Sequence, residues 1–267
     1  MTDPSSIALA AHYGPARPIY EAWQAGRPAR TAWLTIPDPY LAELVAVRGE
    51  VEAVALDLQH GLFDNRVTVE AIRAIALRGK APLVRLAENE AAPVGFLLDA
   101  GAAGIIAPMV ESAGEAEHLV SACRYPPQGR RSYGPTRGGL DADLLATAGQ
   151  TLLFVMIETR QGLAAAEKLA AVDGVTGIFV GPGDLGLSMG IGAGQDREEP
   201  EIRDALARVV QVCRAAGKRC AVHAGTASYA ARMAGEGFDL VTVWVDAVAI
   251  AASLAQAAKQ WTDGRAG

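Results

Sequence analysis

The sequence lacks the features on which several large protein classes depend. Aromatic residues make up only 6% of its 267 residues, and a net charge of −6 comes with no strong basic run, so a nucleic-acid partner is not expected. No apolar run reaches the roughly 20 residues of a membrane-spanning helix, and no signal-peptide pattern is found, so no membrane partner is expected. The three cysteines, Cys123, Cys213 and Cys220, lack metal-ligand spacing. They predict reduced thiols in a cytoplasmic protein.

Short apolar runs alternate with helical patterns along most of the chain. Eight of these runs are expected to be strands, and several are rich in Val and Ile. They occupy residues 31–36, 53–58, 82–86, 103–107, 152–157, 176–180, 219–223 and 239–244. Eight strands, each followed by a helix, predict an α/β fold of the (β/α)8 TIM-barrel type, with residues 1–267 as a single domain. A doubly wound sheet is the alternative, but no GxGxxG follows the first strand.

Two segments depart from this alternation. Residues 1–30 precede the first strand and are expected to form an N-terminal extension at the bottom of the barrel. Residues 124–150 form a long connection that contains four arginines and several prolines and glycines. Long connections in compact domains are usually functional or disordered, which favours an active-site loop here, with a mobile surface loop as the alternative.

Charged side chains stand at the ends of several expected strands, and in a barrel these ends form the catalytic rim. The residues concerned are His60, Arg85, Glu158 and Asp184. Because neighbouring strands lie about 5 Å apart, Glu158 and Asp184 can share one hard cation such as Mg²⁺ or Mn²⁺. The alternative is that both acids cap the helices that follow them.

The remaining rim residues suit an anionic substrate. Arginine at the end of an apolar strand is costly unless it is paired with a carboxylate or a substrate anion, which favours a ligand role for Arg85. His60 is a candidate general base, with a structural histidine as the alternative, and His223 at another strand end is the second candidate. The turn Gly181-Pro182-Gly183 offers backbone amides at a helix start, which suit a carboxylate.

Six stretches of the chain carry a recognisable pattern: AVALDLQHGLFD, PLVRLAENE, LLDAGAAGIIAPMVES, RYPPQGRRSYG, MIETRQGL and GIFVGPGDLGLSMG. Together they resemble the HpcH/HpaI aldolase family, the metal-dependent class II pyruvate aldolases. Their order and spacing match the family over residues 30–250, nearly the whole chain. The resemblance implies an aldehyde-lyase that forms or cleaves 4-hydroxy-2-oxo acids, with pyruvate and an aldehyde as the small-molecule substrates.

The resemblance also implies a role for each matching residue. Glu158 and Asp184 match the two ligands of a divalent ion, which is Mg²⁺, Mn²⁺ or Co²⁺. Arg85 matches the arginine that contacts the pyruvate carboxylate and enolate oxygen, and His60 matches the histidine assigned to acid–base work. Gly181, Pro182 and Gly183 match the turn that binds the pyruvate carboxylate. No lysine is required, because the metal replaces a Schiff base.

Asp99, in LLDAG, matches an acid that reaches the catalytic histidine of a neighbouring subunit. A complete site would then require a homo-oligomer, typically a hexamer with sites at the subunit interfaces. Two residues depart from the family pattern: Gln59 stands where Glu is common, and Met156 stands where Gln is common. Two other functions are considered: a related lyase of the malyl-CoA or citramalyl-CoA type, and a non-catalytic subunit that binds a 2-oxo acid.

Overall fold

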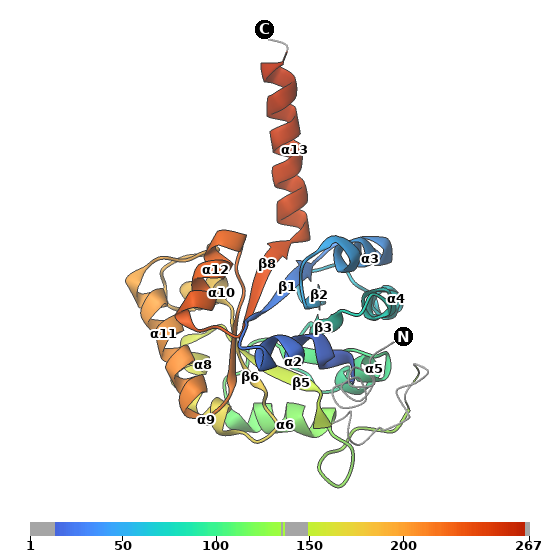
Figure 1. The fold of residues 1–267 in the computed structure, drawn as a ribbon. Coiled ribbons are helices and arrows are strands. Elements are labelled where there is room, and N and C mark those ends of the chain that lie inside the picture. The colour runs from blue at the N-terminus through green and yellow to red at the C-terminus, as the bar shows by residue number, and fades with distance from the viewer. Residues whose placement is uncertain (1–13, 135, 137–148, 265–267) are drawn as a thin grey trace.

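A computed structural model describes residues 14–134, 136 and 149–264 of the chain. Eight parallel strands pair in chain order and close into one barrel (Figure 1). They are β1 (Ala29–Leu34), β2 (Ala53–Asp57), β3 (Ala81–Arg85), β4 (Gly104–Ala107), β5 (Leu152–Ile157), β6 (Gly177–Val180), β7 (Arg219–Val222) and β8 (Leu240–Val245). Each overlaps an expected strand, and no end differs by more than two residues. The prediction of a (β/α)8 barrel is therefore confirmed.

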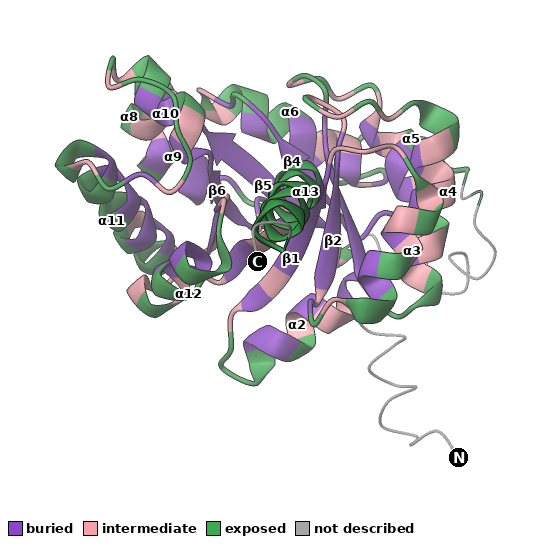
Figure 2. Cartoon of the chain, turned by 90° about the horizontal axis from the view of Figure 1, so that it is seen from above, coloured by how far each residue is buried: buried purple, intermediate pink, exposed green. Residues whose placement is uncertain are grey.

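Helices surround the barrel and bury one face each against it (Figure 2). They are α3 (Pro39–Arg48), α4 (Asn65–Leu77), α5 (Val94–Asp99), α6 (Ala113–Cys123), α8 (Arg160–Ala164), α9 (Ala166–Ala171), α10 (Pro182–Ser188), α11 (Pro200–Ala215) and α12 (Ala227–Glu236). Apolar side chains fill two layers, one inside the barrel around Trp33, Phe154 and Phe179, and one between strands and helices. Strands with both faces covered explain the nearly continuous apolar runs in the sequence.

Side-chain caps fix where several helices begin. Asp38, Asp64 and Thr226 each accept a hydrogen bond from the backbone N–H three residues further on. Ser112 and Glu115 form a reciprocal capping box at the start of α6. Because these caps satisfy N–H groups that have no partner inside the helix, the turns between strands and helices are held in place at the rim.

The N-terminal extension ends earlier than expected, because Ala29 and Arg30 already belong to β1. Within it, η1 (Gly14–Ala16) leads into α2 (Arg17–Gln24), which buries Ile19, Ala22 and Trp23. Trp23 Nε1 donates to the carbonyl oxygen of Asp239, the residue before β8, at 2.8 Å. Helix α2 therefore lies against the N-terminal ends of the strands. Residues 1–13 lie outside the described residues.

The last helix, α13 (Asp246–Asp263), follows β8 directly, with no residue between them. Buried Asp246 accepts hydrogen bonds from the N–H groups of Thr35 and Ile36 at 2.9 and 2.8 Å, which ties this junction to the end of β1. From Ala251 onward every described residue of α13 is exposed, and the helix projects away from the barrel (Figures 1 and 2). No helix in the described ranges combines the length and the apolar character needed to cross a bilayer.

Candidate active site

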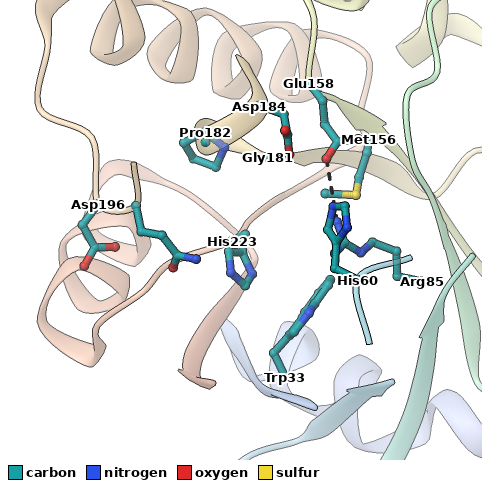
Figure 3. A pocket seen from close by; sticks show the side chains of 12 residues that line it. Trp33, His60, Arg85, Met156, Glu158, Gly181, Pro182, Asp184, Asp196 and His223 are labelled. Carbon is teal, nitrogen blue, oxygen red and sulfur yellow. Dashed lines mark ion pairs between the residues drawn. The ribbon is translucent and has the colours of Figure 1, made fainter. Parts of the chain in front are cut away.

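A cavity of about 120 Å³ lies at the C-terminal ends of the strands. It brings together seven of the eight predicted site residues: His60, Arg85, Glu158, Gly181, Pro182, Gly183 and Asp184. Trp33, Met156, Gln195, Asp196 and His223 complete its lining. Figure 3 shows these side chains around one space. They come from several different strands and from the loops that follow them. Among the predicted residues, only Asp99 is absent from the lining.

Arg85 is buried at the end of β3 and is held by a carboxylate from the neighbouring strand. Its Nε donates to Asp57 Oδ1 at 2.9 Å and its Nη2 to Asp57 Oδ2 at 2.5 Å. Burial alone raises the pKa of Asp57, but the hydrogen bond and charge of Arg85 outweigh burial and hold that pKa below its ordinary value. The third nitrogen, Nη1, lies 3.9 Å from Glu158 Oε1 at the cavity. Asp57 therefore fixes the guanidinium while one end of it faces the cavity.

Asp57 also fixes the turn that carries His60. Its Oδ1 accepts hydrogen bonds from the backbone N–H groups of Gln59 and His60 at 3.0 and 3.2 Å. Only glycine fits at position 61, because a Cβ there would lie 2.2 Å from the carbonyl oxygen of Asp57. His60 itself is exposed and lines the cavity on the same side as Arg85 (Figure 3). One buried carboxylate thus positions two residues predicted to be catalytic.

Glu158 follows β5 and is only 2% exposed. Its Oε2 accepts a hydrogen bond from the backbone N–H of Met109 at 3.0 Å. Burial raises the pKa of Glu158 above its ordinary value; the Met109 N–H and Arg85 lower it in part, and the charge of Asp184 raises it further. Two acids that repel each other in a partly buried site favour either a shared proton or a shared cation.

The alternative that both acids cap helices is wrong. Thr159 caps α8, since its Oγ1 accepts the N–H of Gly162 at 3.0 Å. The residue at the N-cap of α10 is Gly181, and Asp184 lies inside the first turn of that helix. Both carboxylates therefore remain available at the cavity.

The main role of the Gly181-Pro182-Gly183 turn is to leave space for the Glu158 side chain. A Cβ on Gly181 would lie 2.8 Å from Glu158 Oε1 and 2.9 Å from Glu158 Cγ, so only glycine lets Glu158 take this position. The N–H of Gly181 already donates to the carbonyl oxygen of Ile157 at 3.2 Å. Pro182 has no N–H. The prediction that backbone amides of this turn bind a carboxylate therefore depends on Gly183.

Glu158 and Asp184 suit a divalent ion of the Mg²⁺ type. Within residues 14–134, 136 and 149–264 there is no group of three His, Cys, Asp or Glu side chains that could hold a metal. Magnesium does not need one, because proteins bind it through one or two carboxylates while water and substrate oxygens fill its other positions. Oε1 of Glu158 accepts no hydrogen bond from the described residues, which leaves it free to bind a cation.

Asp99 lies at the end of α5, away from this cavity. Arg131 Nη2 donates to its Oδ1 at 2.6 Å, and the same guanidinium stacks over Tyr125 at 4.6 Å from the ring centroid. Arg130 contacts His118. The described part of the connection 124–150 therefore packs near α5 and α6, whereas Arg137 and most of its second half lie outside the described residues. Its role as an active-site loop stays a prediction.

Sequence reasoning missed the wall formed by Trp33, Gln195 and Asp196. Trp33 points into the barrel from β1, and its Nε1 donates to Asp57 Oδ2 at 3.1 Å. Gln195 and Asp196 come from the segment between α10 and α11, in which glycines obscure any periodicity. An aromatic residue in the expected first strand was the only available signal.

Comparisons with known proteins assign the chain to a family. The profile of the HpcH/HpaI aldolase/citrate lyase family matches residues 31–258. A hydroxypyruvate/pyruvate aldolase of Rhizorhabdus wittichii is 41% identical over 241 residues, which cover 89% of this chain and 96% of that protein. A 4-hydroxy-2-oxo-heptane-1,7-dioate aldolase of Salmonella dublin is 33% identical over 86% of this chain and 89% of that protein.

Among solved structures, an HpcH/HpaI aldolase/citrate lyase family protein from Burkholderia cenocepacia superposes with a TM-score of 0.81 at 29% identity. The superposition covers 88% of this chain and 95% of that one. The sequence match and the structural superposition therefore give the same family, and both cover nearly the whole barrel. The chain belongs to the HpcH/HpaI aldolase/citrate lyase family.

Proposed function

We propose that this chain is a divalent-metal-dependent aldolase that forms or cleaves 4-hydroxy-2-oxo acids, with pyruvate or hydroxypyruvate and an aldehyde as the smaller partners. Family membership makes it a carbon–carbon lyase of the aldolase type. One observation carries the specific proposal. Two acids, one arginine and one histidine from four different strand ends line a single cavity of about 120 Å³, a size that suits a three-carbon acid.

The two carboxylates, buried Glu158 and exposed Asp184, and the guanidinium of Arg85 have different roles toward the 2-oxo acid. Glu158 and Asp184 would hold Mg²⁺, Mn²⁺ or Co²⁺, and such an ion supplies Lewis-acid stabilisation of negative charge on the 2-oxo oxygen. Arg85 presents Nη1 3.9 Å from Glu158, so its positive charge lies where the enolate develops. Since Asp57 already orients Arg85, little reorganisation is needed when that charge appears.

His60 moves the proton at the methyl carbon of pyruvate. This proton leaves when the enolate forms for condensation and returns after cleavage. The backbone bonds to Asp57 hold the His60 turn at the cavity, and a residue from another copy, Asp99, would orient the exposed imidazole. Asp99 is only partly exposed, and its Oδ1 accepts a hydrogen bond from Arg131. Its carboxylate is therefore already held in place before another copy binds.

Proton exchange tests this function directly. In deuterated water with Mg²⁺, Mn²⁺ or Co²⁺, the protein is expected to exchange the methyl protons of pyruvate, measured by proton NMR, and to condense pyruvate with at least one small aldehyde. Excess EDTA should abolish both reactions, and added metal should restore them, because the proposed ion supplies the Lewis acid that stabilises the enolate. Full activity in EDTA, or no exchange with any of the three ions, would contradict the proposal.

A homo-oligomer is supported by the last helix and by a groove on the barrel. The groove has a volume of about 1,100 Å³ and lies between α3 and α12 over the outer face of β1 and β8. Its lining is mainly apolar and includes Leu41, Leu44, Val45, Ala231 and Trp244. This is the place where an eighth helix would complete the layer around the barrel. The chain's own α13 does not fill it.

The direct β8–α13 junction explains why α13 leaves its own barrel, because a connection of no residues cannot turn a chain back. Two exposed apolar side chains of α13, Leu254 and Trp261, are seven residues apart and share one helix face with Ile250, which lines the groove of its own chain. That face of α13 and the lining of the groove are both apolar. The α13 of one copy therefore packs in the groove of another, and the number of copies, six by resemblance, stays a prediction.

Paired lysine variants test the assembly. Leu254→Lys places a charge on the apolar face of α13 and should weaken association by at least ~10-fold, measured by sedimentation velocity. Leu44→Lys, in the groove, should have the same effect. Ala252→Lys adds the same charge to another face of the helix and should assemble normally. A monomeric wild-type protein at micromolar concentration, or equal assembly of all three variants, would contradict the arrangement.

A further inference from the structure

One wall of the cavity takes no part in the proposed mechanism, and His223 is its centre. His223 follows β7, and its backbone N–H donates to the carbonyl oxygen of Val180 at 3.0 Å. Its ring meets the Trp33 ring edge-on, with 4.9 Å between the centroids and 69° between the planes. These contacts hold the imidazole at the cavity on a different side from His60 (Figure 3).

The imidazole is neutral and has unused hydrogen-bonding capacity. Burial, and then the positive charge of Arg85, lower the pKa of His223 to about 4, so the ring has one donor and one acceptor nitrogen at pH 7. Its Nδ1 is buried and has no hydrogen-bond partner in the part of the chain that the structure describes. Buried polar atoms in native proteins nearly always have a partner, so a group in the cavity is expected to supply one.

The segment beside His223 is fixed before any ligand arrives. Asp196 adopts a left-handed backbone with φ of 53°, and its carboxylate accepts hydrogen bonds from Gly225 N–H at 2.7 Å and Thr226 Oγ1 at 2.6 Å. Gln195 packs on Gly225 so closely that a Cβ there would lie 2.7 Å from Gln195 Oε1. The turn after β7 therefore fixes Asp196, and the exposed Gln195 side chain next to it lines the same polar wall of the cavity.

The charges of this wall indicate which substrate group it accepts. His223 is neutral, Gln195 is uncharged, and Asp196 is an anion that repels a second carboxylate. Arg85, the one arginine or lysine among the residues that line this cavity, is already bonded to Asp57 and faces Glu158. An uncharged hydroxyl group, which both donates and accepts, fits the neutral ring and the amide best.

We propose that His223 is a specificity-determining residue that hydrogen-bonds an uncharged hydroxyl group of the substrate, with the Gln195 amide beside it. This inference rests on the proposed aldolase function and names the substrate class of that site. The hydroxyl group belongs either to carbon 3 of the 2-oxo acid, as in hydroxypyruvate, or to the aldehyde, as in glycolaldehyde.

Selectivity ratios test the role of His223. We would measure kcat/KM for hydroxypyruvate against pyruvate, and for glycolaldehyde against acetaldehyde, in the wild-type protein, His223→Phe and His223→Gln. His223→Phe removes the hydrogen bond and should lower one of the two ratios by at least ~10-fold, while His223→Gln keeps the ratio within about threefold of wild type. The ratio that falls identifies which substrate carries the hydroxyl group.

Two results would overturn the inference. The first is that both ratios are unchanged in His223→Phe. The second is an equal fall in His223→Phe and His223→Gln, which would show that the shape of the side chain, and not its hydrogen bond, determines selectivity. If His223→Phe does not fold, as judged by thermal melting, His223→Leu repeats the comparison with a smaller apolar side chain. Pyruvate proton exchange by the wild-type protein separates the two proposals. Its absence would overturn both, whereas exchange with unchanged ratios would overturn only the role of His223.

Discussion

Replacing Arg85 with alanine is expected to lower the rates of pyruvate proton exchange and aldol cleavage by at least ~100-fold, because the enolate loses its nearest fixed positive charge. The variant should also lose about 3 kcal/mol of folding stability, since buried Asp57 loses its ion-pair partner and keeps only the hydrogen bonds from Trp33, Gln59 and His60. Exchange would be followed by NMR, cleavage by release of pyruvate, and stability by urea unfolding. Normal exchange in a folded variant would remove Arg85 from the mechanism.

A double variant separates the two effects. Arg85→Met combined with Asp57→Asn removes both charges, so it should recover much of the lost stability without recovering activity. The single Arg85→Ala variant should also respond to pH. Without Arg85, burial is the largest influence on the pKa of Asp57 and raises it against the hydrogen bonds of Trp33 and His60, so protonation is expected to favour the folded state. The stability deficit against wild type should therefore shrink as the pH falls from 7 toward 4, where wild-type Asp57 begins to lose its own contribution.

Gly181→Ala is expected to disable the cation site without touching a charged residue. The new Cβ would lie 2.8 Å from Glu158 Oε1, so the carboxylate must move. A displacement of about 1 Å at a reacting centre can reduce turnover by ~100-fold, and that is the loss we expect. Mn²⁺ affinity, measured by titration calorimetry, should fall at the same time by at least ~10-fold.

The control for this variant is Gly114→Ala, since nothing lies within 4 Å of a Cβ at that position in α6. It should keep wild-type Mn²⁺ affinity and turnover. If Gly181→Ala also binds Mn²⁺ normally, Glu158 is not the residue that holds the ion.

The sequence alone was sufficient for the strands and for most of the rim. Apolar runs of strand length mark the barrel because both faces of each strand are covered. In such a barrel the catalytic residues lie at the C-terminal ends of the strands. Glu158 and Asp184 follow two neighbouring strands, so they could be predicted to lie together. The Asp57–Arg85 pair could not, because it depends on the register of β2 against β3, where these two residues are direct partners.

The missed wall and the last helix were beyond sequence reasoning for different reasons. Asp196 is held by Gly225 and Thr226, about thirty residues further along the chain, and no local pattern encodes such a contact. Helical spacing in α13 predicts a helix with one apolar face but not that the helix projects away from its own barrel. The positions of loops that are fixed by distant partners, and the direction in which α13 projects, are therefore not predicted by local sequence patterns.

The tie between Asp246 and the end of β1 closes the barrel where its first and last strands meet, and it also sets the direction in which α13 leaves. If α13 of one copy fills the groove of another, as proposed, a solitary chain leaves both the apolar groove and the apolar face of α13 exposed to water. The melting temperature should then rise with protein concentration by mass action, because association stabilises the folded state.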